Sequence, residues 1–324
     1  MKNIFENIPA NLFRTNLKEN KTGTFKIALV REVVGPMINR SNYADETIVF
    51  RTQEGKNLIE VPARKWKAPD KLTGLKLCRQ TSAVSEDVRY NVIKTSNELA
   101  NPNSILFGDS VTASNDAVGI KARVIYDWAY SIRPVDELVD TIQHNALSEG
   151  GTMYDEEEGK LRQSLFRVQY IQPQTYFPQF ITLENATPEL LFHLLSSILF
   201  TSRYGAQSTT TGNNVRNHIV AMGYDTVEAP LNSFTFSNNW NEATEVNLEN
   251  IKAEMLKQMQ DNYAENLIQG EDLEVTIRET WKSDLTSEYQ ATQEQCVEYL
   301  KEIKVYKEPK AKKAPAKKKQ PVEA

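Results

Sequence analysis

The segment T-P-E-L-L-F-H-L-L-S-S-I-L-F-T-S-R-Y-G-A-Q, residues 187–207, predicts a buried helix that opens into a polar loop. Thr187 can cap the helix, and the apolar residues that follow recur at the three- and four-residue spacing of one helix face. Gly205 is expected to end the segment, because glycine readily adopts the left-handed conformation found after helices. The helix is therefore expected to lie in the core and its exit on the surface.

The helix exit carries residue types that suit a sugar-phosphate chain. A cation, an aromatic ring and an amide stand at Arg203, Tyr204 and Gln207, before a loop of serine, threonine, glycine and asparagine. Such groups contact phosphate and ribose without reading the base sequence. The same residues also fit an ordinary surface loop after a well-capped helix, and the sequence leaves both interpretations open.

Strands are predicted on both sides of this helix. Residues 166–183 alternate aromatic with polar residues, and residues 215–222 form the next strand, which gives a β-α-β unit. A central strand at 25–34 and a helix at 86–99 indicate an earlier unit of the same kind. Two such units predict an α+β fold with a ferredoxin-like or RRM-like core, enlarged by insertions. Further strands are expected at residues 47–51, 58–61 and 118–132.

Two insertions are expected in this core. Residues 62–85 contain two prolines, a glycine and many bases with little periodicity, so we expect an ordered insertion or a mobile loop there. Residues 145–164 hold three glycines around four acids at 155–158, which predicts a projecting hairpin with an acidic tip. Those acids lack the ligand spacing of a calcium loop, so a metal site is disfavoured.

Charge is distributed unevenly along the 324 residues. The net charge of −5, taken alone, disfavours a nucleic-acid partner. However, residues 240–305 hold 15 acids and 6 bases, residues 307–324 hold seven lysines and two acids, and residues 51–94 hold ten bases and five acids. A local basic face is therefore possible in an acidic protein.

The composition is that of a soluble globular protein, with 40% hydrophobic and 25% charged residues. No apolar run approaches the roughly 20 residues that cross a bilayer, and the first residues lack the apolar region of a signal peptide. A cytoplasmic location is therefore expected. We divide the chain into residues 1–240, the core with its insertions, residues 241–306, which are acidic and helical, and residues 307–324, a disordered lysine-rich tail.

The sequence supports no catalytic or metal-binding motif. Gly108-Asp109-Ser110 matches part of a serine-esterase signature, but none of the three histidines has the aspartate three residues before it that the usual triad pairing supplies. Cys78 and Cys296 are too far apart in sequence for a CxxC zinc site. We therefore expect neither enzyme activity nor a metal nor a cofactor.

The order of several short segments resembles the backbone subunit of type I-D CRISPR surveillance (Cascade) complexes, part of the RAMP superfamily. The segments are Ile-Ala-Leu-Val-Arg-Glu (27–32), Ile-Val-Phe-Arg-Thr (48–52), Ser-Ile-Leu-Phe-Gly (104–108) before Ala-Arg-Val (122–124), Glu-Gly-Gly-Thr-Met-Tyr-Asp (149–155) and Thr-Ser-Arg-Tyr-Gly-Ala-Gln (201–207). Together they span roughly residues 25–220. Some members of the family carry cysteines suited to zinc, and this chain has no such cluster.

The resemblance implies a modified ferredoxin-like palm with inserted finger and thumb elements. The basic residues 62–85 would be the finger, and the hairpin at 145–164 would be the thumb, with Met153 or Leu161 as an apolar wedge. Such a subunit polymerises along CRISPR RNA (crRNA) with neighbouring copies of itself and other CRISPR effector subunits. It meets target DNA through the guide and has no membrane partner.

The expected RNA contacts combine this resemblance with the distribution of cations. Each cation equally fits a solubilising surface charge. Two other functions stay open: a guide-directed endoribonuclease that uses a loop aspartate, Asp109 or Asp116, and a structural assembly subunit without nucleic acid. The phosphate contacts are expected at Arg31, Arg51, Lys65, Lys67, Arg79, Arg123 and Arg203, and the ribose-phosphate path at Tyr204, Gly205 and Gln207.

Overall fold

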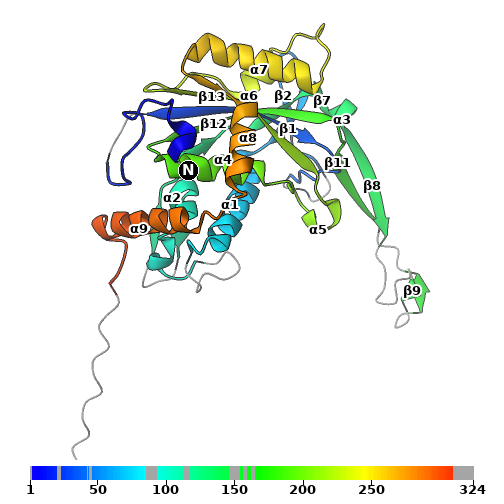
Figure 1. Cartoon of the computed structure of the whole chain (residues 1–324). Coiled ribbons are helices and arrows are strands. Elements are labelled where there is room, and N and C mark those ends of the chain that lie inside the picture. The colour runs from blue at the N-terminus through cyan, green and yellow to red at the C-terminus, as the bar shows by residue number, and fades with distance from the viewer. Residues whose placement is uncertain are drawn as a thin grey trace, which may run out of the picture.

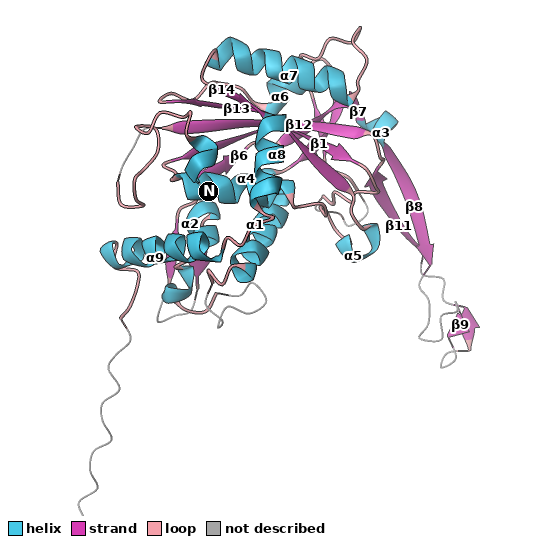
Figure 2. Ribbon diagram, viewed as in Figure 1, coloured by secondary structure: helices cyan, strands magenta, loops and turns pink. Residues whose placement is uncertain are grey.

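A five-stranded antiparallel sheet with helices on both faces forms the centre of the molecule (Figure 1). The structure, a computed structural model, describes residues 2–19, 23–41, 43, 46–84, 93–112, 117–145, 154–155, 159–161 and 165–308. Figure 2 shows how the strands gather into this sheet, with α7 on one side and α1 and α4 on the other. The mixed α/β class that the sequence predicts is confirmed.

The central sheet has the strand order β14-β13-β1-β12-β6, and every neighbouring pair is antiparallel. Its middle strand is β1, which confirms the strand predicted at 25–34. Ala28 of β1 lies opposite Phe180 on one side and Ala221 on the other. The strands are β1 (Thr24–Val33), β6 (Val124–Tyr126), β12 (Thr175–Glu184), β13 (Val215–Asp225) and β14 (Leu267–Gln269).

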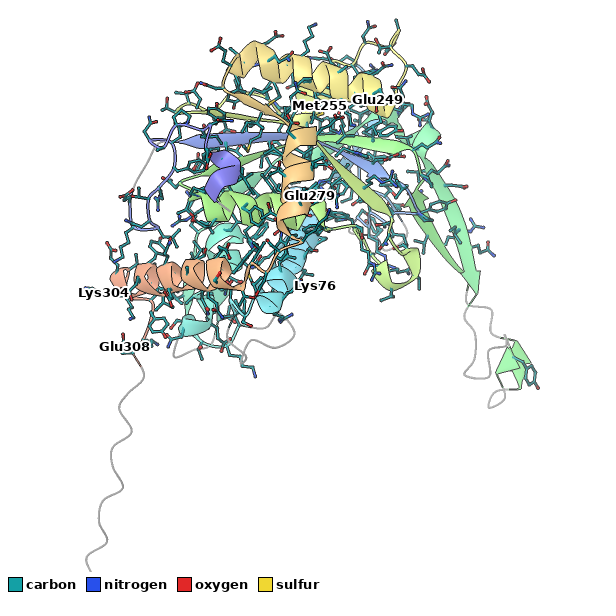
Figure 3. All side chains as sticks on the ribbon, viewed as in Figure 1. Lys76, Glu249, Met255, Glu279, Lys304 and Glu308 are labelled. Carbon is teal, nitrogen blue, oxygen red and sulfur yellow. The ribbon has the colours of Figure 1, made fainter. Side chains whose placement is uncertain are left out.

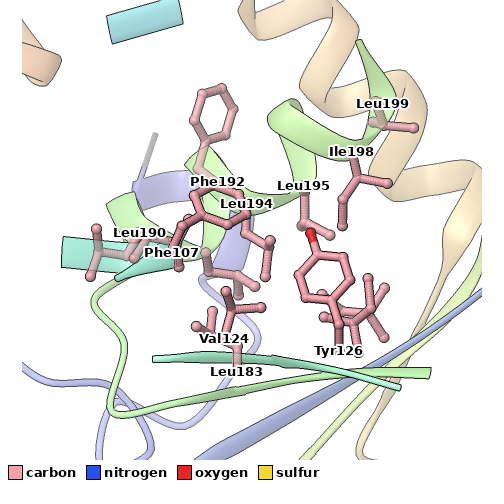
Figure 4. Packing of buried hydrophobic residues seen from close by; sticks show 14 of the residues in the cluster. Phe107, Val124, Tyr126, Leu183, Leu190, Phe192, Leu194, Leu195, Ile198 and Leu199 are labelled. Atoms are coloured by element: carbon pink, nitrogen blue, oxygen red, sulfur yellow. The ribbon is translucent and has the colours of Figure 1, made fainter. Parts of the chain in front are cut away.

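One face of the sheet is covered by α4 (Pro188–Leu199), which forms as predicted. Thr187 accepts a hydrogen bond from the backbone N–H of Leu190 and so caps the first turn. The helix packs beside α1 (Ala63–Gln80) and α2 (Pro102–Phe107). Figure 4 shows its leucine side chains against Val124 and Leu183 of the sheet. Burial of this apolar face accounts for its place in the core.

The opposite face of the sheet is covered by α7 (Leu248–Tyr263), which packs on β1 and β13. Its buried residues recur every fourth position, at Ile251, Met255, Met259 and Tyr263, as expected of a helix with one apolar face. The short helix α6 (Ser233–Asn238) packs on β12 beside it. Both faces of the sheet are thus closed over much of their area by helices.

Smaller elements surround this core. The two-stranded β8–β11 ribbon projects from the body, and α5 lies between that ribbon and α1 (Figure 1). The elements are β2 (Val49–Arg51), β3 (Asn57–Val61) and β7 (Ala129–Pro134) in one sheet, β8 (Val139–Asn145) with β11 (Leu165–Ile171), β4 (Asp109–Val111) with β5 (Val118–Ile120), β9 (Tyr154–Asp155) with β10 (Lys160–Leu161), the helices α3 (Val135–Leu138), α5 (Ser208–Thr211), α8 (Gly270–Thr280) and α9 (Thr286–Glu302), and the 3-10 helices η1 (Lys2–Phe5) and η2 (Ser96–Leu99).

Residues 62–85 differ from their prediction, because most of them form the regular helix α1 rather than a loop-like insertion. Trp66, Leu75 and Cys78 are buried on its inner side. Gly74 lies so close to α4 that an added Cβ would be 2.6 Å from the Ser197 hydroxyl oxygen. Gly74, a residue type that disfavours helix, thus permits close packing of α1 on α4. Burial of the inner side of α1 outweighs the low helix propensity of its sequence.

Other predicted elements are confirmed or corrected at their boundaries. The acidic segment at 241–306, expected to be helical, contains α7, α8 and α9. The strand predicted at 118–132 is divided among β5, β6 and β7. The strand predicted at 166–183 is divided between β11 and β12, and Pro178 lies inside β12 opposite Val30.

Several predictions fall on residues that the structure does not describe. Residues 86–92 of the helix predicted at 86–99 lie outside the described residues, and within the described residues 93–99 the helical part is the 3-10 turn η2. Met153, most of the hairpin at 145–164 and residues 309–324 of the tail also lie outside the described residues, whereas Leu161 belongs to β10. None of the described helices is long and apolar enough to cross a membrane.

Candidate nucleic-acid interface

A fully buried ion pair joins β1 to α1. The Arg31 Nη2 atom lies 2.9 Å from the Asp70 Oδ2 atom, and both side chains are 0% exposed. Arg31 also donates to Gln179 of β12 and Asn217 of β13, and its guanidinium carbon lies 4.8 Å from the centre of the Trp66 ring. Three strands and one helix are therefore tied together by one cation.

Tyr204 completes this network from the loop that follows α4. Its hydroxyl donates to Asp70 Oδ1 and accepts from Arg31 Nη1 at 2.7 Å. Tyr126 of β6 donates to the other carboxylate oxygen of Asp70 at 2.9 Å. Burial, and then the Asp70 carboxylate, raise the pKa of Tyr204 well above its usual value, so its hydroxyl stays protonated and can donate.

Burial and charge act in opposite directions on Arg31. Desolvation lowers the pKa of Arg31, but the Asp70 carboxylate and the nearby tyrosines more than offset it, so the pKa is raised. The buried cation is therefore permanently charged, and each of its three nitrogens donates a hydrogen bond within the protein. We refer to Arg31, Asp70, Tyr126, Gln179, Tyr204 and Asn217 as the Arg31 network.

The prediction that Arg31 and Tyr204 form a surface for RNA is wrong, because neither side chain reaches the surface. Asp70 and neutral protein groups satisfy the charge of Arg31 from within the protein. Tyr204 packs its ring 5.1 Å from that of Trp66. These two residues fix the loop from inside, while their neighbours in sequence remain outside.

Two further predicted contacts are engaged inside the protein. Arg123 donates to the Asn185 carbonyl at 2.8 Å, and its guanidinium lies 5.2 Å from the Tyr299 ring, which ties α9 to the body. Lys67 is half-buried, with its Nζ atom 3.5 Å from the Val124 carbonyl oxygen. Desolvation lowers the pKa of both groups. Their donors serve the fold.

The remaining predicted cations do not all lie together. Arg51 is exposed on β2, at the edge of the small sheet, whereas Lys65 and Arg79 lie near opposite ends of α1. Fourteen residues separate Lys65 from Arg79, which corresponds to about 21 Å along a helix. One compact surface therefore cannot include all of the residues predicted from the sequence.

Three adjoining segments do bring a basic surface together. Ile38 forms a β-bridge with Ala206, which places residues 38–40 beside the loop after α4. On the other side of the same segment, Lys65 Nζ donates to Asn39 Oδ1 at 2.8 Å and to the Arg40 carbonyl. We call the surface of these segments the α1–loop face, and define it by Arg40, Arg64, Lys65, Arg203 and Gln207.

In the part of the chain that the structure describes, the cations of the α1–loop face lack acidic partners. Among the described residues, Arg40, Arg64, Lys65 and Arg203 form no ion pair. Desolvation, and then the charge of Arg64, lower the pKa of Lys65 to about 8. A cluster of like charges in which one member is half-desolvated is poised to gain from an added anion.

Arg40 gives a second sign of a missing partner. Its Nε atom is buried and has no hydrogen-bond acceptor among the described residues, and the same holds for the Thr47 hydroxyl. Arg40 and Thr47 face each other across an isolated β-bridge. Buried polar groups are nearly always hydrogen-bonded. An anion that reorients the Arg40 guanidinium would remove the free-energy cost of leaving its Nε donor without an acceptor.

Gly205 and Gln207 shape the loop on this face. Gly205 has a φ of 82°, and a Cβ added there would lie 2.6 Å from the Ile38 carbonyl oxygen. Gln207 is exposed and immediately precedes the short helix α5. Arg203 is also exposed, and its Nε atom donates to Asn213 Oδ1 at 3.0 Å. The glycine thus permits the close backbone approach that holds the exposed side chains in place.

Arg40 and Arg64 were absent from the residues predicted from sequence. Arg64 belongs to the basic stretch at 51–94, but no pattern distinguishes it from the other bases. Arg40 lies in an irregular connection after Gly35-Pro36, where no helical or strand period applies. The pairing of residues 38–40 with the loop after α4 and with Lys65 places both arginines on the α1–loop face.

The residues of the alternative functions are held in structural contacts. The Asp109 carboxylate lies 2.8 Å from Lys71 Nζ and also accepts from the Ser104 hydroxyl, whereas Asp116 lies outside the described residues. Burial lowers the pKa of His193 to about 3, and that ring contacts Tyr289. Among the described residues, no group of three His, Cys, Asp or Glu side chains is placed to hold a metal ion.

A basic patch on one face of a domain is the electrostatic feature by which nucleic-acid-binding proteins are recognised. The family model described as Csc2 Crispr matches residues 41–313. The chain therefore belongs to the Csc2 CRISPR family.

Solved structures are similar in fold at low sequence identity. Csc2 of Thermofilum pendens is similar with a TM-score of 0.60 and 15% identity, over 90% of this chain and 95% of that one. A chain of a CRISPR RNA-guided surveillance complex, pre-nicking, is similar with a TM-score of 0.50 and 12% identity, over 76% of this chain and 90% of that one. No curated protein matches the sequence.

Proposed function

We propose that this protein is a non-catalytic subunit of a CRISPR effector complex and that it holds guide RNA on the α1–loop face. Membership of the Csc2 CRISPR family supports a CRISPR role. The observation that carries the RNA-binding part is the cluster of cations for which the described residues offer no acidic partner, and in which the pKa of Lys65 is lowered to about 8. We also propose that the complex is of type I-D and that the protein belongs to the RAMP superfamily. Neighbouring copies bind along one crRNA together with other effector subunits, and they meet target DNA through the guide.

The sheet topology supports a palm of the ferredoxin-like kind. Taken in chain order, β1, α1, β6, β12, α4 and β13 form a β-α-β-β-α-β pattern, with the strand order β13-β1-β12-β6. In this account residues 1–240 are the palm with its insertions, and residues 241–306 support it from the other side. The projecting β8–β11 ribbon is the base of the thumb, with Met153 or Leu161 as its wedge.

The RNA path in this account differs from that of an ordinary RRM. An RRM stacks bases on the open face of its sheet. Here α7 lies on that face, across β1 and β13, with Met255 and Met259 fully buried against it. The α1–loop face lies at the other side of the sheet, beside α1. Cations there would bind phosphates regardless of sequence, and base pairing would supply specificity.

Binding of mixed-sequence RNA tests this function. We expect the purified protein to bind oligoribonucleotides of unrelated sequence with similar affinity, because phosphate contacts carry no sequence information. Its affinity is expected to fall with salt, at about 0.7 logarithmic units per phosphate contact for each tenfold increase. Fluorescence anisotropy over a salt titration measures both quantities. Absence of binding, or binding that is independent of salt, would reject the function.

The lowered pKa of Lys65 predicts a pH dependence of RNA binding. Because this pKa is about 8, Lys65 is charged at pH 7 and mostly neutral at pH 9. Loss of its phosphate contact at pH 9 lowers the salt slope by about 0.7. Extrapolated from 1 M salt, this predicts about fivefold weaker binding at 0.1 M salt than at pH 7. Anisotropy titrations at the two pH values check this for the wild type. The Lys65→Arg variant, whose charge persists, should lose the pH dependence, and an unchanged drop in that variant would exclude Lys65 as its source.

A further inference from the structure

A small cavity opens on the flank of α1, away from the Arg31 network. It has a volume of about 220 Å³. Its apolar wall is formed by Ala68, Leu72, Leu75 and Ile93, and its polar lining by Lys71, Asn101, Asn103, Ser104 and Asp109. At ~30 Å³ per water, this volume equals about seven waters, and it is below the ~300–1,000 Å³ of sites for drug-sized ligands. The cavity is therefore large enough for one ring system and too small for a larger ligand.

The cavity has an apolar wall with one unpaired donor at its base. Leu72 is 41% exposed, which is unusual for a leucine on a basic helix, and Leu75 lies behind it. Asn103 is only 1% exposed, and its Oδ1 atom is 3.2 Å from His193 Nε2. Its Nδ2 atom forms no hydrogen bond among the described residues. This amide donor is therefore available to a group in the cavity that presents an acceptor.

Lys71 adds a second donor at the rim. Its ammonium group contacts Asp109 Oδ2 at 2.8 Å and the Gly108 carbonyl oxygen at 2.8 Å, and an ammonium has three donors. One N–H is therefore available for a ligand. Two donors and apolar walls favour a flat, apolar group with acceptors on its edge, which describes a nucleobase with a ring carbonyl or ring nitrogen.

The position of the cavity on α1 connects it to the α1–loop face. Arg64, Ala68, Leu72 and Lys76 follow one another at four-residue spacing and are all exposed, so they form one stripe along the helix. Eight residues from Arg64 to Leu72 correspond to about 12 Å. Figure 3 labels Lys76 further along the same helix. A strand held at Arg64 and continuing toward Lys76 would pass the mouth of the cavity.

We propose that this cavity receives one unstacked base of the RNA strand that the α1–loop face holds. The inference rests on the proposed function, because the strand must first be held by its backbone. The base would lie against Leu72 and Leu75, with an acceptor atom toward Asn103 Nδ2. Each subunit would then contribute one base contact that depends on shape and stacking in addition to its phosphate contacts.

Comparison of two RNA strands of equal length tests the proposal. One is an oligouridylate, and the other has the same ribose-phosphate backbone without bases. Since stacking contributes ~1–3 kcal/mol per base, the wild type should bind the oligouridylate about 5- to 150-fold more tightly. The Ala68→Phe variant places a ring at the mouth and should reduce this ratio to near one, and Leu72→Asn should also reduce it. Gln80→Phe, at an exposed position of α1 outside the cavity, is the matched control.

The outcomes separate this inference from the proposed function. If neither strand binds, both fail. If both strands bind equally to the wild type, or if Ala68→Phe keeps the full ratio, RNA is held but the cavity receives no base. If Ala68→Phe leaves RNA binding intact and instead prevents association with another protein, the cavity accepts a protein side chain and the inference is overturned.

Discussion

Replacing Asp70 with alanine is expected to lower the free energy of unfolding by about 3–5 kcal/mol, the typical cost of breaking a buried ion pair at one partner. Arg31 would remain 0% exposed and charged with no acidic partner. The hydroxyls of Tyr126 and Tyr204 would also lose their acceptor. The loss is large because an uncompensated charge remains in the interior, whereas the intact pair itself contributes little.

Urea denaturation of both proteins measures this difference, with an unchanged slope as the sign that the unfolded state is the same. Glu242→Ala is the matched control. The Glu242 side chain is 79% exposed, and its carboxylate lies 2.6 Å from Lys56 Nζ. Because solvent screens that exposed pair, its loss is expected to leave the free energy of unfolding close to the wild-type value. If Asp70→Ala costs no more than the control, the buried network does not form as described.

Removal of two cations from the α1–loop face should have the largest effect on RNA binding. For the double variant Arg64→Gln with Arg203→Gln, we expect the salt slope to fall by about 1.4, because each phosphate contact on single-stranded nucleic acid contributes ~0.7. Extrapolated from 1 M to 0.1 M salt, this is about 25-fold weaker binding. Both side chains are exposed, so the fold should be unaffected.

A second double variant separates a local contact from net charge. Arg51→Gln with Lys257→Gln also removes two positive charges, but from exposed positions on β2 and α7. Anisotropy titrations should give nearly wild-type affinity and slope for this control. Equal losses in the two double variants would mean that RNA responds to the total charge alone, and the α1–loop face would lose its special role.

The core was predictable where local signals agree. At 187–199 the capping threonine, the proline of the first turn and the apolar spacing all indicate a helix, and α4 forms there with Thr187 as its cap. The β-branched run at 25–34 likewise forms the central strand β1. Such signals lie within a few residues of one another, so no knowledge of the fold is needed to read them.

The Arg31 network was not predictable from sequence alone. Its partners lie 39 residues away at Asp70 and 173 residues away at Tyr204. An arginine next to apolar residues looks the same in sequence whether a ligand or a buried carboxylate satisfies it. One signal was available: Asp70 is the only acid between residues 63 and 80, where six bases occur. A lone acid in such a helix is a candidate for an internal partner.

The α1–loop face depends on contacts between distant segments. Residues 38–40, 64–65 and 203–207 meet because Ile38 bridges to Ala206 and Lys65 reaches Asn39. The helix α1 was missed because Pro69 and Gly74 resemble breakers, whereas burial of Trp66 and close packing on α4 stabilise it. Tertiary packing thus decided both the helix and the basic surface beside it.

Photo-crosslinking of bound RNA, followed by mass spectrometry of the peptides, tests the central claim most directly. The account predicts crosslinks within residues 38–40, 64–72 and 203–208, with few on α7. Crosslinks confined to α7 and the β2–β3–β7 sheet, with the α1–loop face unlabelled, would contradict it.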